Sequence, residues 1–128
     1  MNRKDLIDRL QELYKDEDSR VTINPHAEQK VAIVYPNTYF VGMSNLGLHI
    51  IYEEINLHPS SVCERIFLPE KKELDAYDKT KTPLMSVETQ RPMYQFDVVA
   101  FDVTFEMDYF HIPLMLRHGR VPVMSEDR

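Results

Sequence analysis

The amino-acid sequence predicts an α/β fold, a doubly wound and mostly parallel sheet with an additional helix near the N-terminus. Three runs of mostly apolar residues, at 31–35, 62–68 and 97–103, have the continuous hydrophobicity of strands that are covered on both faces. A stretch with helical character follows each run, so strands and helices alternate along the chain. Alternation of this kind favours parallel strands joined by right-handed crossovers.

Composition limits the classes of function. The 128 residues suffice for one domain, and the formal net charge of -6 argues against a nucleic-acid partner. No apolar run approaches the roughly 20 residues of a membrane helix, and the charged start MNRKDLIDRL is not a signal peptide. We therefore expect no membrane partner and a cytoplasmic location. Cys63, the only cysteine, is expected to be a packed core thiol, and alone it cannot form a disulfide, an iron–sulfur site or a thiolate zinc site.

The N-terminal part is expected to be an appendage of the sheet domain. A helix over residues 5–15 is predicted by one apolar face, formed by Leu6, Ile7, Leu10, Leu13 and Tyr14. Residues 16–20 form a polar connector, and residues 21–23 suit a short edge strand before a turn at Asn24 and Pro25. We therefore divide the chain into an N-terminal helix with its connector, residues 1–29, and a partial α/β domain, residues 30–128.

The unit at residues 30–57 organises this domain. A strand at 31–35 is followed by a loop at 37–43, and Ser44 has the side chain of a helix N-cap. The helix behind it has an apolar stripe made of Leu48, Ile51, Tyr52 and Ile55. Pro59 ends the unit, because proline cannot continue a helix.

The remaining elements follow the same alternation. A strand at 62–68 precedes a charged helix at 70–78, anchored by Leu74 and Tyr77, and an extended piece at 84–87. A strand at 97–103 precedes a helix at 106–117, one face of which carries Phe110, Leu114 and Arg117, with Ile112, Met115 and Leu116 beside it. Pro113 should kink this helix, Gly119 should end it in the C′ position, and residues 121–124 should start another strand.

The expected sheet is of the Rossmann-like or flavodoxin-like kind, which has about five or six strands. Only three strands are clear in this sequence, so we expect the opening part of a truncated domain. An incomplete sheet leaves one edge bare, and bare edges pair with other strands. We therefore expect self-association into a homo-oligomer through that edge.

Ligands of open parallel sheets bind outside the carboxyl ends of the strands, so residues 36–47 are the first candidate site. Ser44 and Asn45 could hold an anion at a helix N-terminus, or they could simply cap the helix. Gly42 and Gly47 could let a ligand approach the backbone, and Gly47 could equally let the helix pack close to the sheet. The aromatic side chains of Tyr39 and Phe40 could stack on a planar cofactor, cover the sheet edge or face another domain.

A second candidate group is acidic and lies near the carboxyl end of the third predicted strand; it consists of Asp102, Glu106 and Asp108. Two of these could form an acid–base pair or bind a cation, but we favour roles as helix caps and dipole partners. Arg65 and Arg91 could pair with these carboxylates or with phosphate. Asp108 and His111 are one helical turn apart, but no second cluster supports a metal site.

Three segments in the same order carry a resemblance to a known family. They are VAIVYPNTYFVGMSNLGLHIIYEEIN at 31–56, CERIFLP at 63–69 and SVETQRPMYQFDVVAFDVTFEMDYFHIPLML at 86–116. In these segments the sequence resembles the N-terminal region of a radical S-adenosylmethionine, or Fe–S oxidoreductase-like, protein family. The similarity runs from about residue 31 to the C-terminus.

The resemblance implies a cobalamin-binding-like α/β domain that precedes a catalytic barrel. In the family, the barrel carries a cysteine triplet that holds a [4Fe–4S] cluster and reductively cleaves S-adenosylmethionine. This sequence has no such triplet, so we expect the cluster, S-adenosylmethionine and the radical chemistry in a downstream barrel domain, whose active site the present domain would hold or shape. The alternative is a degenerate docking or oligomerisation domain that binds no cofactor. A free-standing dinucleotide binder is disfavoured, because no Gly-x-Gly-x-x-Gly follows the first strand.

Cobalamin is the cofactor that the resemblance implies for this domain. Related domains that ligate cobalt use a histidine in an Asp-x-His-x-x-Gly loop after the first strand, whereas residues 36–42 contain no histidine. Such domains also place a small hydroxyl residue at the end of the third strand, where this sequence has Asp102. The candidate cofactor contacts are Asn37, Tyr39, Gly42, Ser44, Asn45, Gly47, Asp102 and Thr104.

Overall fold

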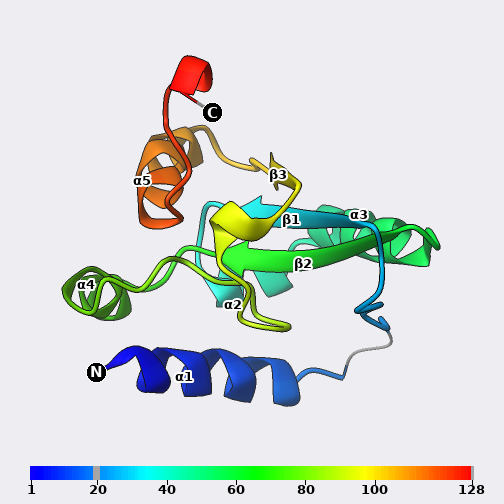
Figure 1. Cartoon of the computed structure of the whole chain (residues 1–128), viewed down its shortest axis with the longest axis horizontal. Coiled ribbons are helices and arrows are strands. Elements are labelled where there is room, and N and C mark those ends of the chain that lie inside the picture. Colours follow the sequence, from blue (N-terminus) through cyan, green and yellow to red (C-terminus); the bar gives the residue numbers. More distant parts are fainter. Residues whose placement is uncertain (19–20, 128) are drawn as a thin grey trace.

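The protein contains an open, all-parallel sheet. The computed structural model describes residues 1–18 and 21–127, and in this part of the chain three strands pair in the order β2-β1-β3. The strands are β1 (Gln29–Tyr35), β2 (Ser61–Phe67) and β3 (Val98–Phe101). Figure 1 shows the sheet at the centre, with helices around it. The predicted α/β class with parallel strands is therefore confirmed.

The central strand β1 is buried from Val31 to its end because helices cover both of its faces. Val31 and Ile33 face the side of α3 (Leu46–Leu57), where they pack with Leu48 and Tyr52. Ala32 and Val34 face the opposite side and join a second apolar cluster. That cluster takes in buried residues of the helices α1 (Arg3–Lys15), α4 (Lys71–Lys79) and α5 (His111–His118), namely Leu6, Ala76, Tyr77, Met115 and Leu116.

The N-terminal helix packs on the domain through Leu6, which is 1% exposed and belongs to the second cluster. A capping box begins the helix, because Asn2 Oδ1 accepts from the Asp5 amide at 2.9 Å while Asp5 Oδ2 accepts from the Asn2 amide at 2.9 Å. The edge strand predicted at residues 21–23 is wrong, since this segment is irregular. Its apolar side chains Val21 and Ile23 pack against the α3 side of the core instead of pairing in the sheet.

The loop predicted at residues 37–43 is partly wrong, because it contains a short helix, α2 (Tyr39–Met43), whose N-cap is Thr38. Ser44 is the C-cap of this helix and not the N-cap of α3. Asn45 caps α3 instead, with its Oδ1 accepting from the Leu48 amide at 2.9 Å. On α3 the predicted apolar stripe is buried only in part, since Ile51 is exposed.

The single kinked helix predicted at 106–117 is wrong. The structure has a 3-10 helix, η2 (Glu106–Phe110), followed by α5. Pro113 is the third residue of α5, where its missing N–H costs no helical hydrogen bond, so no kink is required. Of the apolar side chains in this segment, Phe110 is 73% exposed, while Met115 and Leu116 are buried.

The end of α5 depends on close packing. Gly119 is the C-cap with φ -82°, so its predicted C′ position is wrong and Arg120, with φ 59°, occupies C′. A Cβ at Gly119 would lie 2.5 Å from Met93 Sδ, so glycine is needed for space. The amides of Arg120 and Val121 donate to Arg117 and Leu116, as in a Schellman motif. The chain turns away here, so the strand predicted at 121–124 is wrong and η3 (Ser125–Asp127) follows.

Helix α4 ends in the same way and supplies a stability prediction. Lys81 has φ 54° and is exposed, and its carbonyl accepts from Arg3 and Arg120. Replacing Lys81 by glycine keeps this carbonyl and relieves the left-handed conformation, so we expect a gain of about 0.5–1 kcal/mol in the free energy of unfolding by urea denaturation. The matched control, Lys79→Gly in the last turn of α4, should lose about as much.

The two edges of the sheet differ. Residues 84–87, predicted to be extended, cover the outer edge of β2, where the Val87 amide donates to the Arg65 carbonyl at 2.9 Å. In the described residues no strand pairs with the outer edge of β3, and Val98 and Ala100 are exposed.

Among residues 1–18 and 21–127, no helix is long and apolar enough to cross a membrane.

Candidate functional site

The carboxyl ends of β1 and β3 bring several of the predicted site residues together. Asn37, two residues after β1, donates from Nδ2 to Asp108 Oδ1 at 3.2 Å, which connects the end of β1 to η2. Its carbonyl accepts from the Leu68 amide at 2.9 Å, which connects it to the end of β2 as well. Asn37 therefore holds three segments in place at the end where ligands of such sheets bind.

Asn45 makes a second link across this end of the sheet. Its Nδ2 donates to Thr104 Oγ1 at 2.8 Å and lies 3.4 Å from the hydroxyl of Tyr35. Asn45 and Thr104, two predicted contacts, therefore meet in the structure and bond to each other. Ser44 beside them does not take part, since its hydroxyl donates to the Phe40 carbonyl at 3.4 Å.

The three residues of the predicted acidic group, Asp102, Glu106 and Asp108, differ in how deeply they are buried. Asp108 is 2% exposed, Asp102 is half-buried, and Glu106 is exposed. Asp102 Oδ2 and Asp108 Oδ2 are buried and have no hydrogen-bond partner among the described residues. Burial raises the pKa of the Asp102 carboxyl.

His111 lies next to this group. Its Nδ1 is 2.7 Å from the Pro36 carbonyl and 3.9 Å from Asp108 Oδ1. The ring is therefore fixed to the backbone at the end of β1. Within residues 1–18 and 21–127, no three acidic, histidine or cysteine side chains form a group that could hold a metal ion.

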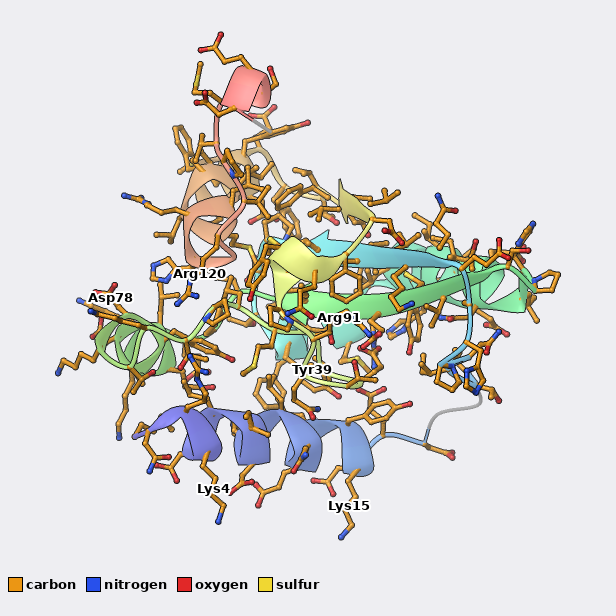
Figure 2. All side chains as sticks on the ribbon, viewed as in Figure 1. Lys4, Lys15, Tyr39, Asp78, Arg91 and Arg120 are labelled. Atoms are coloured by element: carbon orange, nitrogen blue, oxygen red, sulfur yellow. The ribbon has the colours of Figure 1, made fainter. Side chains whose placement is uncertain are left out.

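Tyr39 and Gly42 belong to the packing of α2 and not to the polar group. The hydroxyl of Tyr39 donates to Glu17 Oε2 at 2.6 Å, and its ring packs edge-on against Phe67. Figure 2 shows Tyr39 between the sheet and α1. A Cβ at Gly42 would collide with the Phe67 ring, so this glycine allows α2 to approach β2. Gly47 is exposed, and the nearest atom to an added Cβ would be Asn45 Oδ1, so it does not serve close packing on the sheet.

A buried ionic group centred on Arg65 was missed by the sequence analysis. Arg65 Nε lies 2.6 Å from Glu88 Oε2, and Nη2 lies 2.8 Å from Glu17 Oε1. The guanidinium carbon is 4.4 Å from the centre of the Tyr52 ring. Arg65 therefore pairs with neither the acidic group at β3 nor an open anion site. Nothing in the local sequence marks this pairing, because the partners are distant along the chain.

Large apolar side chains surround the carboxyl end of the sheet and are exposed. This carboxyl-end rim consists of Phe40, Leu46, Phe105, Met107, Tyr109 and Phe110, each more than half exposed. The Asn45–Thr104 hydrogen bond brings its two halves together, because Leu46 and Phe105 adjoin the bonded residues. Apolar side chains gathered in this way are typical of an interaction surface.

These features define a class of protein. It is an α/β domain with a parallel sheet, and its own polar side chains bridge the carboxyl end of that sheet, which exposed apolar side chains border. Residues 47–128, from α3 to the C-terminus, match the family of radical SAM proteins, N-terminal. The chain therefore belongs to the family of N-terminal domains of radical S-adenosylmethionine proteins, which confirms the resemblance. No curated protein and no solved structure gives a significant match to the chain.

Proposed function

We propose that this chain is an accessory domain that docks onto the catalytic barrel of a radical S-adenosylmethionine enzyme and shapes its active site. The family supports a role beside such a catalytic domain. The carboxyl-end rim is the observation that carries the docking role, because it offers apolar surface at the end of the sheet where function concentrates. The [4Fe–4S] cluster and S-adenosylmethionine would be held by the barrel, since this chain has a single, buried cysteine.

The polar groups at the carboxyl end favour docking over the holding of a cofactor. The side-chain amides of Asn37 and Asn45 already bond to Asp108 and Thr104. A cofactor that needed these groups would have to break both hydrogen bonds. The bonds instead stiffen the segments that carry the rim, as a docking surface requires.

Cobalamin binding is a second candidate function, and the observation in its favour is an unpartnered carboxylate oxygen of Asp102, although a carboxylate stands there in place of the small hydroxyl residue of cobalamin domains. Asp102 Oδ2 has no hydrogen-bond partner among the described residues, and Asp102 directly follows β3 at the carboxyl end of the sheet. The bonded state of Asn37 and Asn45 does not fit this use. Titration of hydroxocobalamin with the purified chain tests it: we expect an unchanged visible spectrum, whereas a saturable shift at micromolar concentration would favour cobalamin binding.

The open edge of β3 supports a further contact. Parallel edges without a neighbour pair with strands of other molecules, so we propose that the isolated domain self-associates through β3. A monomeric mass by light scattering at high concentration would contradict this.

The docking role is tested by hydrogen exchange. Backbone exchange of the 128-residue chain alone is compared with exchange of the same residues in the assembled enzyme that contains the barrel. We expect protection at the carboxyl end of the sheet to rise in the assembled enzyme. Exchange that is identical everywhere would contradict an accessory domain that touches the barrel.

A further inference from the structure

A groove between the C-terminal ends of α4 and α5 concentrates positive charge, and we name it the α4–α5 groove. Its volume is about 440 Å³, and its walls carry one carboxylate, Asp78, and four basic side chains, Lys81, Arg117, His118 and Arg120. In Figure 2 Arg120 lies between the two helices. The chain as a whole is acidic, with a formal net charge of -6, so a basic groove on it needs an explanation of its own.

The turns that end the two helices bring these cations together. The Lys81 carbonyl accepts from the side chains of Arg120 and Arg3, so Arg3 adds a further positive charge beside the groove. Lys81 and Arg120 occupy the C′ positions of α4 and α5 with φ 54° and φ 59°. Glycine is the usual residue at a left-handed C′ position, and both helices have a basic residue there instead.

The usual role of cations at helix C-termini does not account for this charge. Basic side chains commonly bond to the last carbonyls of a helix and offset its dipole. In α5 those carbonyls, at residues 115–118, already accept from the backbone amides of residues 84 and 119–121. Within residues 1–18 and 21–127, no carboxylate forms an ion pair with Lys81, Arg117 or Arg120. The three side chains are therefore available to an anion from outside the chain.

We propose that the α4–α5 groove binds the oligophosphate group of a small molecule. Arginine side chains hold phosphate oxygens in bidentate pairs, and the groove has two arginines and a lysine in one wall. An oligophosphate carries several negative charges, as the cations require, whereas a single carboxylate would leave most of them without a counter-ion. None of the residues of the carboxyl-end rim lines the groove, so the inference is independent of the docking role.

Titration calorimetry of the 128-residue chain with inorganic pyrophosphate tests the proposal, and we expect saturable binding. Arg117→Gln should weaken the binding about tenfold, the effect of one lost charge-assisted hydrogen bond. Lys81→Gly should weaken it similarly although this variant is expected to unfold less readily, so the lost affinity does not come from a lost fold. The control is Lys15→Gln, since Lys15 is exposed at the end of α1 opposite to Arg3 and should leave the affinity unchanged.

Two results with the same anion would overturn the proposal. One is the absence of saturable binding, and the other is an equal loss of affinity in Lys15→Gln and Arg117→Gln, which is the behaviour of general surface charge. Raising NaCl from about 0.05 M to about 0.3 M should weaken binding of pyrophosphate, and an affinity unchanged by salt would also contradict a charged contact.

Other anions identify the source of the phosphates. Tighter binding of ATP than of pyrophosphate would assign the groove to a nucleotide, and equal binding would assign it to the oligophosphate group alone; both results support the site. Tighter binding of polyglutamate than of pyrophosphate would assign the groove to an acidic protein and overturn the small molecule as its ligand.

Discussion

Replacing Arg65 by methionine should lower the free energy of unfolding by about 3–5 kcal/mol, the usual cost of breaking a buried ion pair from one side. Arg65 is 1% exposed, and its guanidinium is shared between Glu88 and Glu17. Methionine replaces the aliphatic part of the arginine side chain and carries no charge, so the loss comes mainly from the Glu88 and Glu17 carboxylates, which are left without a counter-ion. Urea denaturation at pH 7 measures the change.

The control for this variant is Arg9→Met. Arg9 lies 3.9 Å from Glu73, and its side chain is 40% exposed, so this pair is screened by solvent and should contribute less than about 0.5 kcal/mol. The double variant Arg65→Met and Glu88→Gln should recover part of the stability, because it removes the buried charge. A loss below 1 kcal/mol for Arg65→Met would mean that the ionic group is not what holds these segments together.

The same variant should change the pH dependence of stability. Burial raises the pKa of the Glu88 carboxyl, and the Arg65 guanidinium opposes this shift by favouring the carboxylate. Without the guanidinium, burial is opposed only by the remaining hydrogen bonds, so the pKa of Glu88 rises further and the folded variant binds a proton at a higher pH than the unfolded chain does. The free energy of unfolding of the variant should therefore rise as the pH falls from 7 toward the pKa of glutamate in the unfolded chain, about 4.3. The difference in free energy of unfolding between the variant and the wild type should become smaller over this range.

The sequence was informative wherever neighbouring residues decide the structure. The strands were found because Val31, Val62 and their neighbours form mostly apolar runs, as strands covered on both faces require. The N-cap of α3 was misplaced by one residue because Ser44 and Asn45 are both good caps. The choice depends on Thr104, far along the chain, which bonds to Asn45.

Distant contacts explain the other failures. Helical periodicity predicted one helix over 106–117, but the structure has a 3-10 helix at Glu106–Phe110, where Asn37 bonds to the buried Asp108 and Phe110 is exposed. The pairing of Arg65 with Glu17 and Glu88 joins three segments and leaves no local pattern in the sequence. The positions of Asn37, Asn45 and Thr104 at the carboxyl end of the sheet could be predicted from where the strands end. The hydrogen bonds of Asn37 to Asp108 and of Asn45 to Thr104 could not be predicted.

Leu6→Ala should lower the free energy of unfolding by about 2–5 kcal/mol, the usual cost of removing a fully buried leucine side chain. Leu6 belongs to the same cluster as Ala32 and Val34 of the central strand. An appendage that folds independently of the sheet would give a much smaller loss. The matched control is Ile50→Ala on α3, where the side chain is 52% exposed and the change should stay within about 0.5 kcal/mol.

The loss of unfolding free energy in Leu6→Ala measures how strongly the N-terminal helix stabilises the rest of the domain, including the candidate site. Glu17, just after α1, accepts from the Tyr39 hydroxyl of α2 and from Arg65 of β2, so α1 is connected to the segment that carries part of the carboxyl-end rim. Removing residues 1–18 would expose the apolar cluster and leave Arg65 with Glu88 alone. We therefore expect the shortened chain to lose cooperative unfolding in urea, whereas a cooperative transition with unchanged midpoint would show that α1 is dispensable.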